Sequence, residues 1–403
     1  MKWALLLLAG VSLPAFAGDL PAAELVVRAL QTHPAVVAAT ARVDAARAER
    51  DALRAGSHEV TASGSISRRE IDADGRHSEY DASLSRAFRL PGKAALDRRA
   101  GELGVDVVQN RMEDSRHQAA LELGALWYDW LLAAELYRNA GRLVDNQQAL
   151  VRATESRLKQ RDAARLELEQ AHAAHAFAAA QQADAAAARD RARTLLGSRF
   201  PDLPLPAEPP SIQPPTVPDE GLEQLQRLIV ARSHEIAAAG GEAERQSVRA
   251  RRAAAERMAD PSLGVRLFSE RGGAEKGAGL TMSLPLGGGH RRALARQAEA
   301  EARAADFDFQ DVTRGITGYA AADVAEYRAR EAAWVSSRDA VARAEQGAVL
   351  AARGQQMGAI DLTDRLYADR QANEARAQEL AARATAARLI LKLRIDSHTL
   401  WID

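Results

Sequence analysis

The chain of 403 residues contains no cysteine. A disulfide framework, a thiolate metal site and an N-terminal lipid anchor through cysteine are therefore excluded. Aromatic residues make up only 4% of the sequence, so few large side chains exist with which to build a thick globular core. Alanine, glutamate, arginine, glutamine and leucine dominate instead, which is the composition typical of long helices and coiled coils.

An excess of one charge is also missing. The 54 basic residues nearly balance the 55 acidic residues, so neither nucleic acid nor an anionic surface is indicated as a partner. Long hydrophobic runs are scarce as well: the first one, Trp3 to Val11, is shorter than the about 20 residues of a transmembrane helix, and no later stretch reaches that length.

The N-terminus has the pattern of a cleavable secretory signal. Lys2 precedes the apolar run, and Ala15-Phe16-Ala17 provides an A-x-A cleavage site at its end. We therefore expect a signal peptide at 1–17 and an exported protein that begins at Gly18. An ordinary buried N-terminal helix is the alternative.

Two short regions of the sequence alternate between apolar and polar residues, with a turn in the middle of each. The turns are Asp72-Ala73-Asp74-Gly75 and Arg271-Gly272-Gly273, so each region predicts a β-hairpin. Phe268 is an exception to the alternation, because it stands where the equivalent positions are small or polar. The predicted strands lie at about 58–69, 77–88, 260–269 and 277–286.

Helix-compatible stretches surround these hairpins. A first helix covers 21 to about 56, with a break marked by Pro34. Long stretches follow the hairpins at about 91–158 and about 290–353, and at about 1.5 Å per residue each is a rod of about 100 Å. Shorter helices return at about 163–196 and about 360–395.

The same order of elements occurs twice in the chain, which predicts a duplicated unit. The first repeat covers 18–200 and the second covers 219–396. Between them lies a linker rich in proline at 201–218, suited to an extended spacer. The tail at 397–403 has no clear pattern.

Proline and glycine mark both corners at which a strand leads into a long helix. The first corner contains Pro91 and Gly92, and the second contains Gly287, Gly288 and Gly289. We expect these residues to provide the sharp bend, where a positive φ is needed. A phosphate-binding loop is not indicated, because no Lys-Ser/Thr pair follows the glycines.

Four strands per chain cannot close a barrel, and open strand edges are not tolerated in lipid. Three chains that contribute four strands each give 12 strands, an even number in the usual range. We therefore expect a mainly α protein with a membrane β part: a homotrimer that forms a 12-stranded β-barrel on an α-helical periplasmic tunnel. A soluble periplasmic coiled coil with two small hairpins is the alternative.

This order of helices, strand pairs and long helical hairpins resembles the TolC-like outer-membrane efflux protein family, over essentially the whole mature chain. Matching segments are the corner at 284–292, the segments at Trp127-Tyr128 and Tyr319, and the hairpin tip at 358–366. The resemblance implies a trimeric duct that tapers shut at the hairpin tips. It implies the passive exit channel of a tripartite efflux pump in the outer membrane, with a periplasmic adaptor and a proton-driven inner-membrane transporter, for small molecules or metal cations.

Two aspartates stand at the tip of the second helical hairpin. Asp361 and Asp364 are three residues apart, and in a trimer each inward aspartate becomes a ring of three charges that selects and holds cations. The family places two aspartates one turn apart here; counted from Gly358, the first matches Asp364 and the second falls on Tyr367, a departure. Asp361 is the candidate substitute for the second. The alternative is that both are solvated surface carboxylates.

The resemblance also implies that ion pairs between the two hairpins close the duct at their tips. Because charge is plentiful on these helices, a chance assignment is an equal alternative. The candidates are Arg161, Asp162, Arg165, Arg353 and Arg365.

No constellation of catalytic residues appears at a workable spacing, so we expect neither an enzyme nor a bound cofactor. His172 and His175 are three residues apart but lack a third ligand nearby for a stable metal site. The competing function is a periplasmic coiled-coil adaptor or structural protein without a channel.

Overall fold

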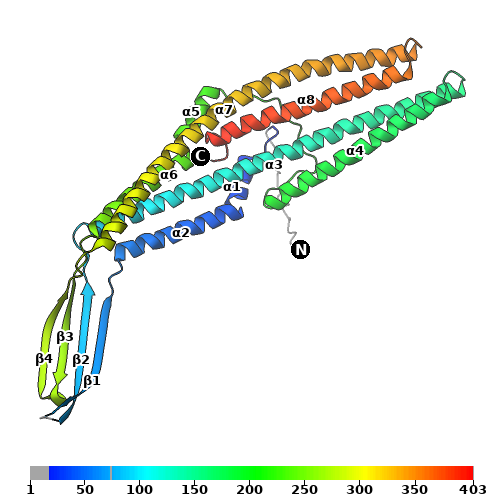
Figure 1. Cartoon of the computed structure of the whole chain (residues 1–403). Coiled ribbons are helices and arrows are strands. Elements are labelled where there is room, and N and C mark those ends of the chain that lie inside the picture. The colour runs from blue at the N-terminus through cyan, green and yellow to red at the C-terminus, as the bar shows by residue number, and fades with distance from the viewer. Residues whose placement is uncertain (1–17, 73–74, 403) are drawn as a thin grey trace, which may run out of the picture. The chain divides into compact units, whose positions relative to one another are not determined.

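The computed structural model describes residues 18–72 and 75–402, so the expected signal at 1–17 lies outside the described residues. Helices predominate, and a small set of strands is inserted between them (Figure 1). The elements in chain order are α1 (Ala23–Gln31), α2 (Pro34–Ala55), β1 (Val60–Ile71), β2 (Gly75–Ala87), α3 (Lys93–Lys159), α4 (Arg165–Arg199), α5 (Leu222–Ala231), α6 (His234–Ala255), β3 (Ser262–Glu270), the 3-10 turn η1 (Arg271–Gly273), β4 (Glu275–Ser283), α7 (Gly289–Gln356) and α8 (Leu362–Asp396).

The expected helices are confirmed. The long helices α3 and α7 have 67 and 68 residues, and the returning helices α4 and α8 have 35 residues each. Pro34 is the first residue of α2, where its missing N–H is tolerated. In the described part of the chain, none of the helices combines the length and the apolar character that a membrane crossing requires.

The chain divides into two compact units, and the division falls within α2, α3 and α7. Of the described residues, the helical unit contains 18–37, Ser115–Ser233 and 316–402. The sheet unit consists of Ala38–Asp114 and His234–Gly315, and contains all four strands.

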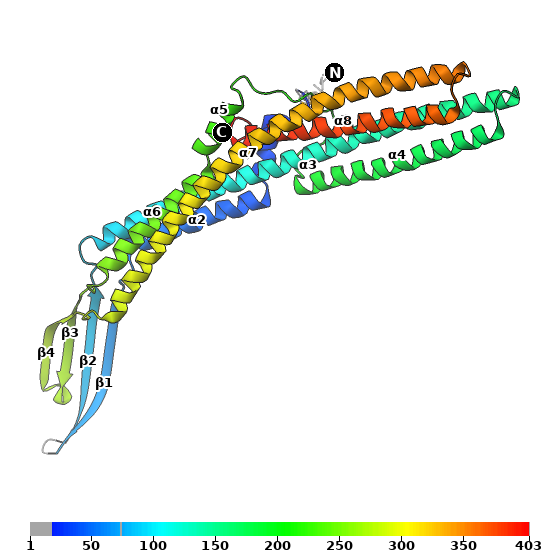
Figure 2. The ribbon, with the colours of Figure 1, turned by 45° about the horizontal axis from the view of Figure 1, so that its top comes forward.

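In the helical unit, the hairpins α3–α4 and α7–α8 lie side by side, with both tips at the same end (Figures 1 and 2). Leu123, Trp127 and Leu131 of α3 recur every four residues and are fully buried, which is the spacing of one helical face. This face packs against α8, which comes so close at Gly124 that a Cβ there would lie 2.8 Å from Leu391 Cδ2. A larger residue at Gly124 would therefore require the Leu391 side chain to move.

The C-terminal tail, for which the sequence shows no pattern, is part of the helical core. Trp401 and Ile402 are only 6% and 5% exposed and pack in the cluster that contains Trp127. The Arg232 guanidinium donates hydrogen bonds to the carbonyl oxygens of Ser397 and His398, at 3.3 and 2.9 Å. The tail is thus held by both apolar burial and hydrogen bonds.

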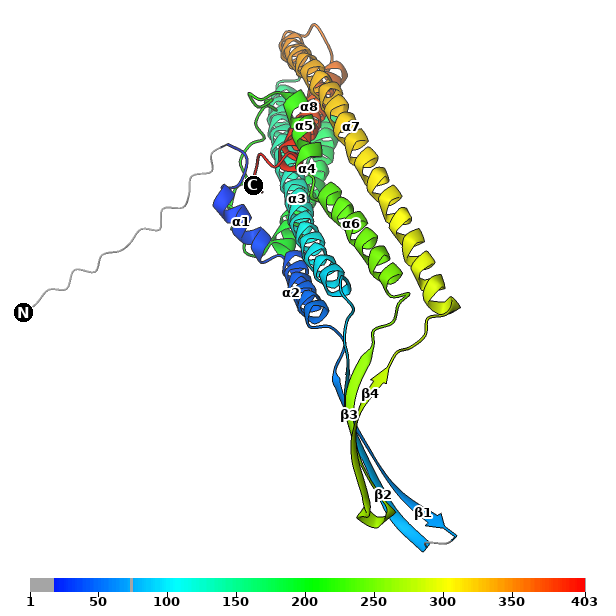
Figure 3. The ribbon, with the colours of Figure 1, turned by 90° about the vertical axis from the view of Figure 1, so that its left-hand side faces the viewer.

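In the sheet unit, the two hairpins form one antiparallel sheet in the order β1-β2-β3-β4 (Figure 3). The expected barrel requires the hairpins to pair at their edges, but the sequence does not specify that β2 and β3 of one chain are the strands that do so. The pairing joins β2 to β3 with Tyr80 opposite Ser269 and Ala87 opposite Ser262. The observed strand ends differ from the expected ones by a few residues.

We expect the substitution Trp401→Ala to lower the free energy of unfolding by about 3 kcal/mol or more, because it leaves a cavity in the core of the helical unit. Urea unfolding followed by the helical circular dichroism signal measures this change. The control is Leu166→Ala, since Leu166 is 68% exposed and its removal should cost less than about 0.5 kcal/mol. Equal midpoints for the two variants would show that the tail does not stabilise the unit.

Candidate functional site

One face of the sheet is apolar. It carries the even-numbered positions of β1, β2 and β4 and the odd-numbered positions of β3, because paired residues in an antiparallel sheet share a face. Its central row runs across all four strands from Ala62 through Leu84 and Val265 to Leu280. Leu280 is 89% exposed in the chain, so this apolar face lacks the cover that a water-soluble sheet needs.

The other face is polar and carries mostly serine, threonine, glycine and charged residues. The hydroxyl oxygens of Ser63 and Ser83 lie 2.7 Å apart across the first hairpin. Arg266 of β3 forms an ion pair with Asp81 of β2, which links the two hairpins. The sheet therefore presents hydroxyls and paired charges on one side and hydrocarbon on the other.

Aromatic side chains mark the two ends of the apolar face. Tyr80 and Phe88 are 53% and 48% exposed, and their even numbers place both on this face along β2. Phe88 follows the last residue of β2, but its N–H still donates to the Pro261 carbonyl oxygen at 2.9 Å. At about 3.4 Å per residue they are about 27 Å apart along the strand.

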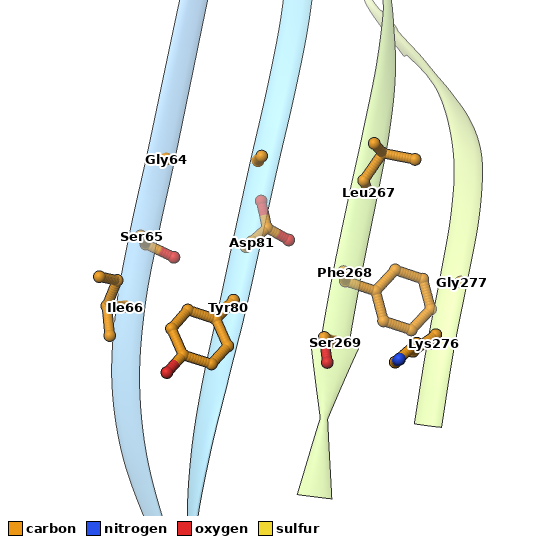
Figure 4. Close-up of a pocket in the computed structure, with 11 residues that line it drawn as sticks. Gly64, Ser65, Ile66, Tyr80, Asp81, Leu267, Phe268, Ser269, Lys276 and Gly277 are labelled. Carbon is orange, nitrogen blue, oxygen red and sulfur yellow. The ribbon is translucent and has the colours of Figure 1, made fainter. Parts of the chain in front are cut away.

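A depression extends over the sheet from the middle of β1 and β2 to the ends of β3 and β4 that meet at their turn (Figure 4). Residues of all four strands line it, from both faces. Its lining is Gly64, Ser65, Ile66, Tyr80, Asp81, Ala82, Leu267, Phe268, Ser269, Lys276 and Gly277.

A buried ion pair holds the strands together where they leave the helices. Lys93, at the start of α3, is 1% exposed, and its Nζ donates to Asp260 Oδ1 and to the Met258 carbonyl oxygen, both at 2.7 Å. The Leu90 N–H donates to the same Asp260 oxygen at 3.0 Å, and His58 Nε2 lies 2.8 Å from the other one. Burial opposes ionisation of Asp260, but Lys93, the Leu90 N–H and His58 outweigh it and lower its pKa to about 2.

Arg89 forms a second set of hydrogen bonds at this end of the sheet. Its guanidinium donates to the carbonyl oxygens of Leu53, Arg54 and Ala55, at 2.9, 2.8 and 3.2 Å. These are orphan carbonyls at the C-terminus of α2, where a cation also complements the helix dipole. Arg89 Nη1 further donates to Asp97 at 3.0 Å, so one side chain connects α2 to α3.

The two corners differ in backbone conformation. Gly92 has a φ of +91°, as expected for a sharp bend. None of Gly287, Gly288 and Gly289 has a positive φ, so the expectation of a left-handed bend is wrong at the second corner. Glycine is required at Gly287 for another reason: a Cβ there would lie 2.7 Å from the Arg257 carbonyl oxygen.

At the tip of the second helical hairpin, Asp361 and Asp364 are both exposed. Asp361 is the N-cap of α8, and its Oδ1 accepts a hydrogen bond from the Asp364 N–H at 2.9 Å. Leu362, only 3% exposed, anchors this end of α8 against α3 and α4. The capping bond and the buried leucine together fix the position of the two carboxylates.

Two of the five charged gate candidates, Asp162 and Arg365, have partners inside their own hairpins. Asp162 pairs with Arg157, with Nε and Oδ2 3.0 Å apart. Arg365 donates to Gln355 Oε1 at 2.9 Å and lies 3.8 Å from Asp369. Within residues 18–72 and 75–402, no ion pair joins the two tips of the chain.

The other three gate candidates, Arg161, Arg165 and Arg353, are exposed. Arg161 has a φ of +63° and Gly358 has a φ of +72°, so each tip turns on one residue in the left-handed region. Arg161 therefore has a backbone role that its charge did not suggest.

A metal centre is not formed by the described ranges: no group of three or more His, Cys, Asp and Glu residues there is arranged to hold an ion. His172 Nε2 lies 4.0 Å from Glu155 Oε1, on the exposed surface.

No family model matches the chain, and no curated protein sequence matches it. Solved structures do match. The outer membrane channel CmeC of Campylobacter jejuni is 15% identical, with a TM-score of 0.76, over 93% of this chain and 84% of that chain. The outer-membrane channel OprN is 24% identical, with a TM-score of 0.78, over 94% and 90%. The open state of the Neisseria gonorrhoeae outer membrane channel MtrE is 17% identical, with a TM-score of 0.73, over 93% and 88%.

The chain has the fold of an outer-membrane channel. The resemblance to the TolC-like proteins is thus confirmed for the fold.

The ion pair between Lys93 and Asp260 could not be predicted from the sequence. The two residues are 167 positions apart, and neither belongs to a recognisable motif. A weak signal was present, because Lys93 directly follows the Pro91-Gly92 corner and Asp260 is the first residue of the second predicted hairpin.

We expect Asp260→Asn to destabilise the protein by about 2 kcal/mol at neutral pH, because the buried Lys93 ammonium loses its closest carboxylate and keeps only Glu256, whose Oε2 lies 3.2 Å from Nζ. Urea unfolding of the purified protein measures this cost. The control is Asp51→Asn, which removes an exposed ion pair with Arg50 worth less than about 1 kcal/mol. A cost no larger than that of the control would refute the role of the pair.

The advantage of wild type over Asp260→Asn should also depend on pH. The folded pKa of Asp260, about 2, is below the reference value of 3.8 for the unfolded chain. The stability that its charge contributes, about 2 kcal/mol, is therefore present above about pH 4 and is lost as the pH falls towards 2. The difference between the two unfolding midpoints, measured from pH 6 to pH 2, should shrink in that window and remain constant above it.

Proposed function

We propose that the mature chain is the protomer of a passive channel in the outer membrane, through which a tripartite efflux pump releases its cargo. The observation that carries this proposal is a four-stranded sheet with an exposed apolar face, a polar face and two outer strands, in a chain with a channel fold. A passive conduit needs binding and passage but no chemical step, so we infer that the protein is not an enzyme.

The proposed assembly is a homotrimer. The outer strands β1 and β4 each have one edge to which no strand of the described chain is paired. Lipid requires these backbone groups to be paired, and pairing β4 of one copy with β1 of the next satisfies them. Three copies give a closed barrel of 12 strands, with the apolar face towards lipid and the polar face towards the pore.

The helical hairpins are proposed to form the periplasmic tunnel of the trimer. The near-equal helix lengths in the two halves support a duplicated unit, since α1 and α5 have 9 and 10 residues and α2 and α6 both have 22. In that duplication the repeats are 18–200 and 219–396, joined by the linker at 201–218. Because the two hairpins, α3–α4 and α7–α8, have similar lengths, each copy can contribute two equivalent helical hairpins to a closed ring.

At the tunnel end, we propose that Asp361 and Asp364 line the aperture. Each is exposed and held by the capping bond, and three copies provide rings of carboxylates that select cations. The exposed Arg161, Arg165 and Arg353 remain available for ion pairs between neighbouring hairpins, and we propose that such pairs close the aperture.

The proposed partners are a periplasmic adaptor, a proton-driven inner-membrane transporter and outer-membrane lipid. The cargo is proposed to be small molecules or metal cations, delivered by the transporter.

We expect the mature protein, purified in detergent, to be a trimer and to conduct ions in planar bilayers. Cross-linking and light scattering measure the mass, and current recordings measure conductance. Cell fractionation should recover the oligomer in the outer membrane. A monomer without conductance, found in the soluble periplasmic fraction, would indicate a structural or adaptor role instead.

The aperture is tested by the double variant Asp361→Asn, Asp364→Asn. Asparagine keeps the N-cap at position 361 but removes the charge, so the fold should be retained. Block of the current by a trivalent cation should weaken by tenfold or more, because two rings of charge are lost. The control is Asp311→Asn, which removes an exposed carboxylate of α7 that lies 3.8 Å from Arg314. Equal block in wild type and the double variant would place the aperture elsewhere.

A further inference from the structure

Phe268 lies on the polar face of the sheet. In the described parts of the four strands, it is the only Phe, Tyr or Trp on that face. Its row across the sheet consists of Ser65, Asp81, Phe268 and Gly277. The adjacent row towards the helices consists of Ser63, Ser83, Arg266 and Gly279. An aromatic ring is thus surrounded by hydroxyls, glycines and one ion pair.

The sheet provides a place for this ring. A Cβ on Gly277 would lie 2.3 Å from Phe268 Cζ, so the ring occupies the space that a side chain on β4 would otherwise fill (Figure 4). The Arg266 guanidinium carbon is 5.5 Å from the ring centroid, within the range of a cation–π contact. Arg266 is also paired with Asp81, the residue directly opposite Phe268 on β2.

Two features make this ring suitable for binding a ligand. The ion pair next to it is internally neutralised, so the region does not strongly favour ions of one sign. The ring itself remains partly exposed, and a Cβ on the neighbouring Gly279 would meet no atom within 4 Å. A flat apolar surface is therefore open to the side of the sheet that is otherwise hydrophilic.

We propose that Phe268 is a specificity-determining residue of the pore, which binds the aromatic or apolar part of amphipathic organic molecules as they leave. This inference rests on the proposed function, because closure of three copies places three Phe268 rings at one level of the lumen. Apolar and aromatic groups gain contact with these rings, whereas a bare metal ion has no apolar part to bury. The structure thereby favours organic small molecules over metal cations as the cargo.

The test uses the trimer of the full mature chain in planar bilayers, with two cationic probes of equal charge. Benzyltrimethylammonium carries an aromatic ring and tetramethylammonium does not. We expect the wild-type current to be blocked more strongly by the aromatic probe. In Phe268→Ala the block by that probe should weaken about threefold to tenfold, as expected for loss of one aromatic contact, while the effect of tetramethylammonium stays the same.

Two further variants separate binding from structure. Phe268→Tyr keeps the ring and should keep the block by benzyltrimethylammonium. Leu267→Ala truncates the adjacent residue on the apolar face, 59% exposed, and should leave the block unchanged. The thermal stability of the wild-type trimer and of the three variant trimers is compared in parallel, to detect a purely structural effect of Phe268→Ala.

The possible outcomes are distinct. A conducting Phe268→Ala channel that is blocked as strongly as wild type would overturn the inference and leave the proposed channel intact. Equal weakening in Leu267→Ala would also overturn it, since the effect would then be one of general sheet packing. A wild-type protein that never conducts would contradict the proposed function itself.

Discussion

Backbone hydrogen bonding at the outer strands is the constraint on which the structure depends. In the described chain β1 pairs with β2 and β4 pairs with β3, so each outer strand presents one edge of N–H and C=O groups without a partner strand. In lipid each such group costs several kcal/mol, so the proposed place of the sheet in a membrane requires both edges to be paired. In the proposed trimer, pairing with neighbouring copies satisfies the backbone groups at both edges, and lipid covers the exposed apolar face.

The register of the strands decides which face meets which environment. A slip of one residue would exchange the apolar and polar faces of a whole strand. The tie between Lys93 and Asp260 acts where this register is set, because His58 precedes β1, Leu90 follows β2 and Asp260 precedes β3. We infer that this buried ion pair fixes the relative positions of β1, β2 and β3, in addition to stabilising the fold.

At the hairpin tips, residue type predicted the roles of the charged residues only in part. Asp361 and Asp364 are exposed as an aperture requires, but the sequence did not show that Asp361 also caps α8. Arg161 is a gate candidate by its charge, but its backbone occupies the left-handed region of a turn. Asp162 and Arg365 already have partners within their hairpins. Ion pairs on a helix surface rich in charge depend on distances of a few ångströms, which composition and spacing do not specify.

The sequence by itself determined the type, order and approximate length of the helices and strands, because helical and alternating periodicity are local properties of a chain. It also marked Phe268 as an exception within its strand. Only the tertiary structure decided that β2 pairs with β3, that Lys93 meets Asp260 and that the tail with Trp401 is buried in the helical core. Each of these contacts joins residues far apart in the chain, so its free energy depends on partners that no local pattern identifies.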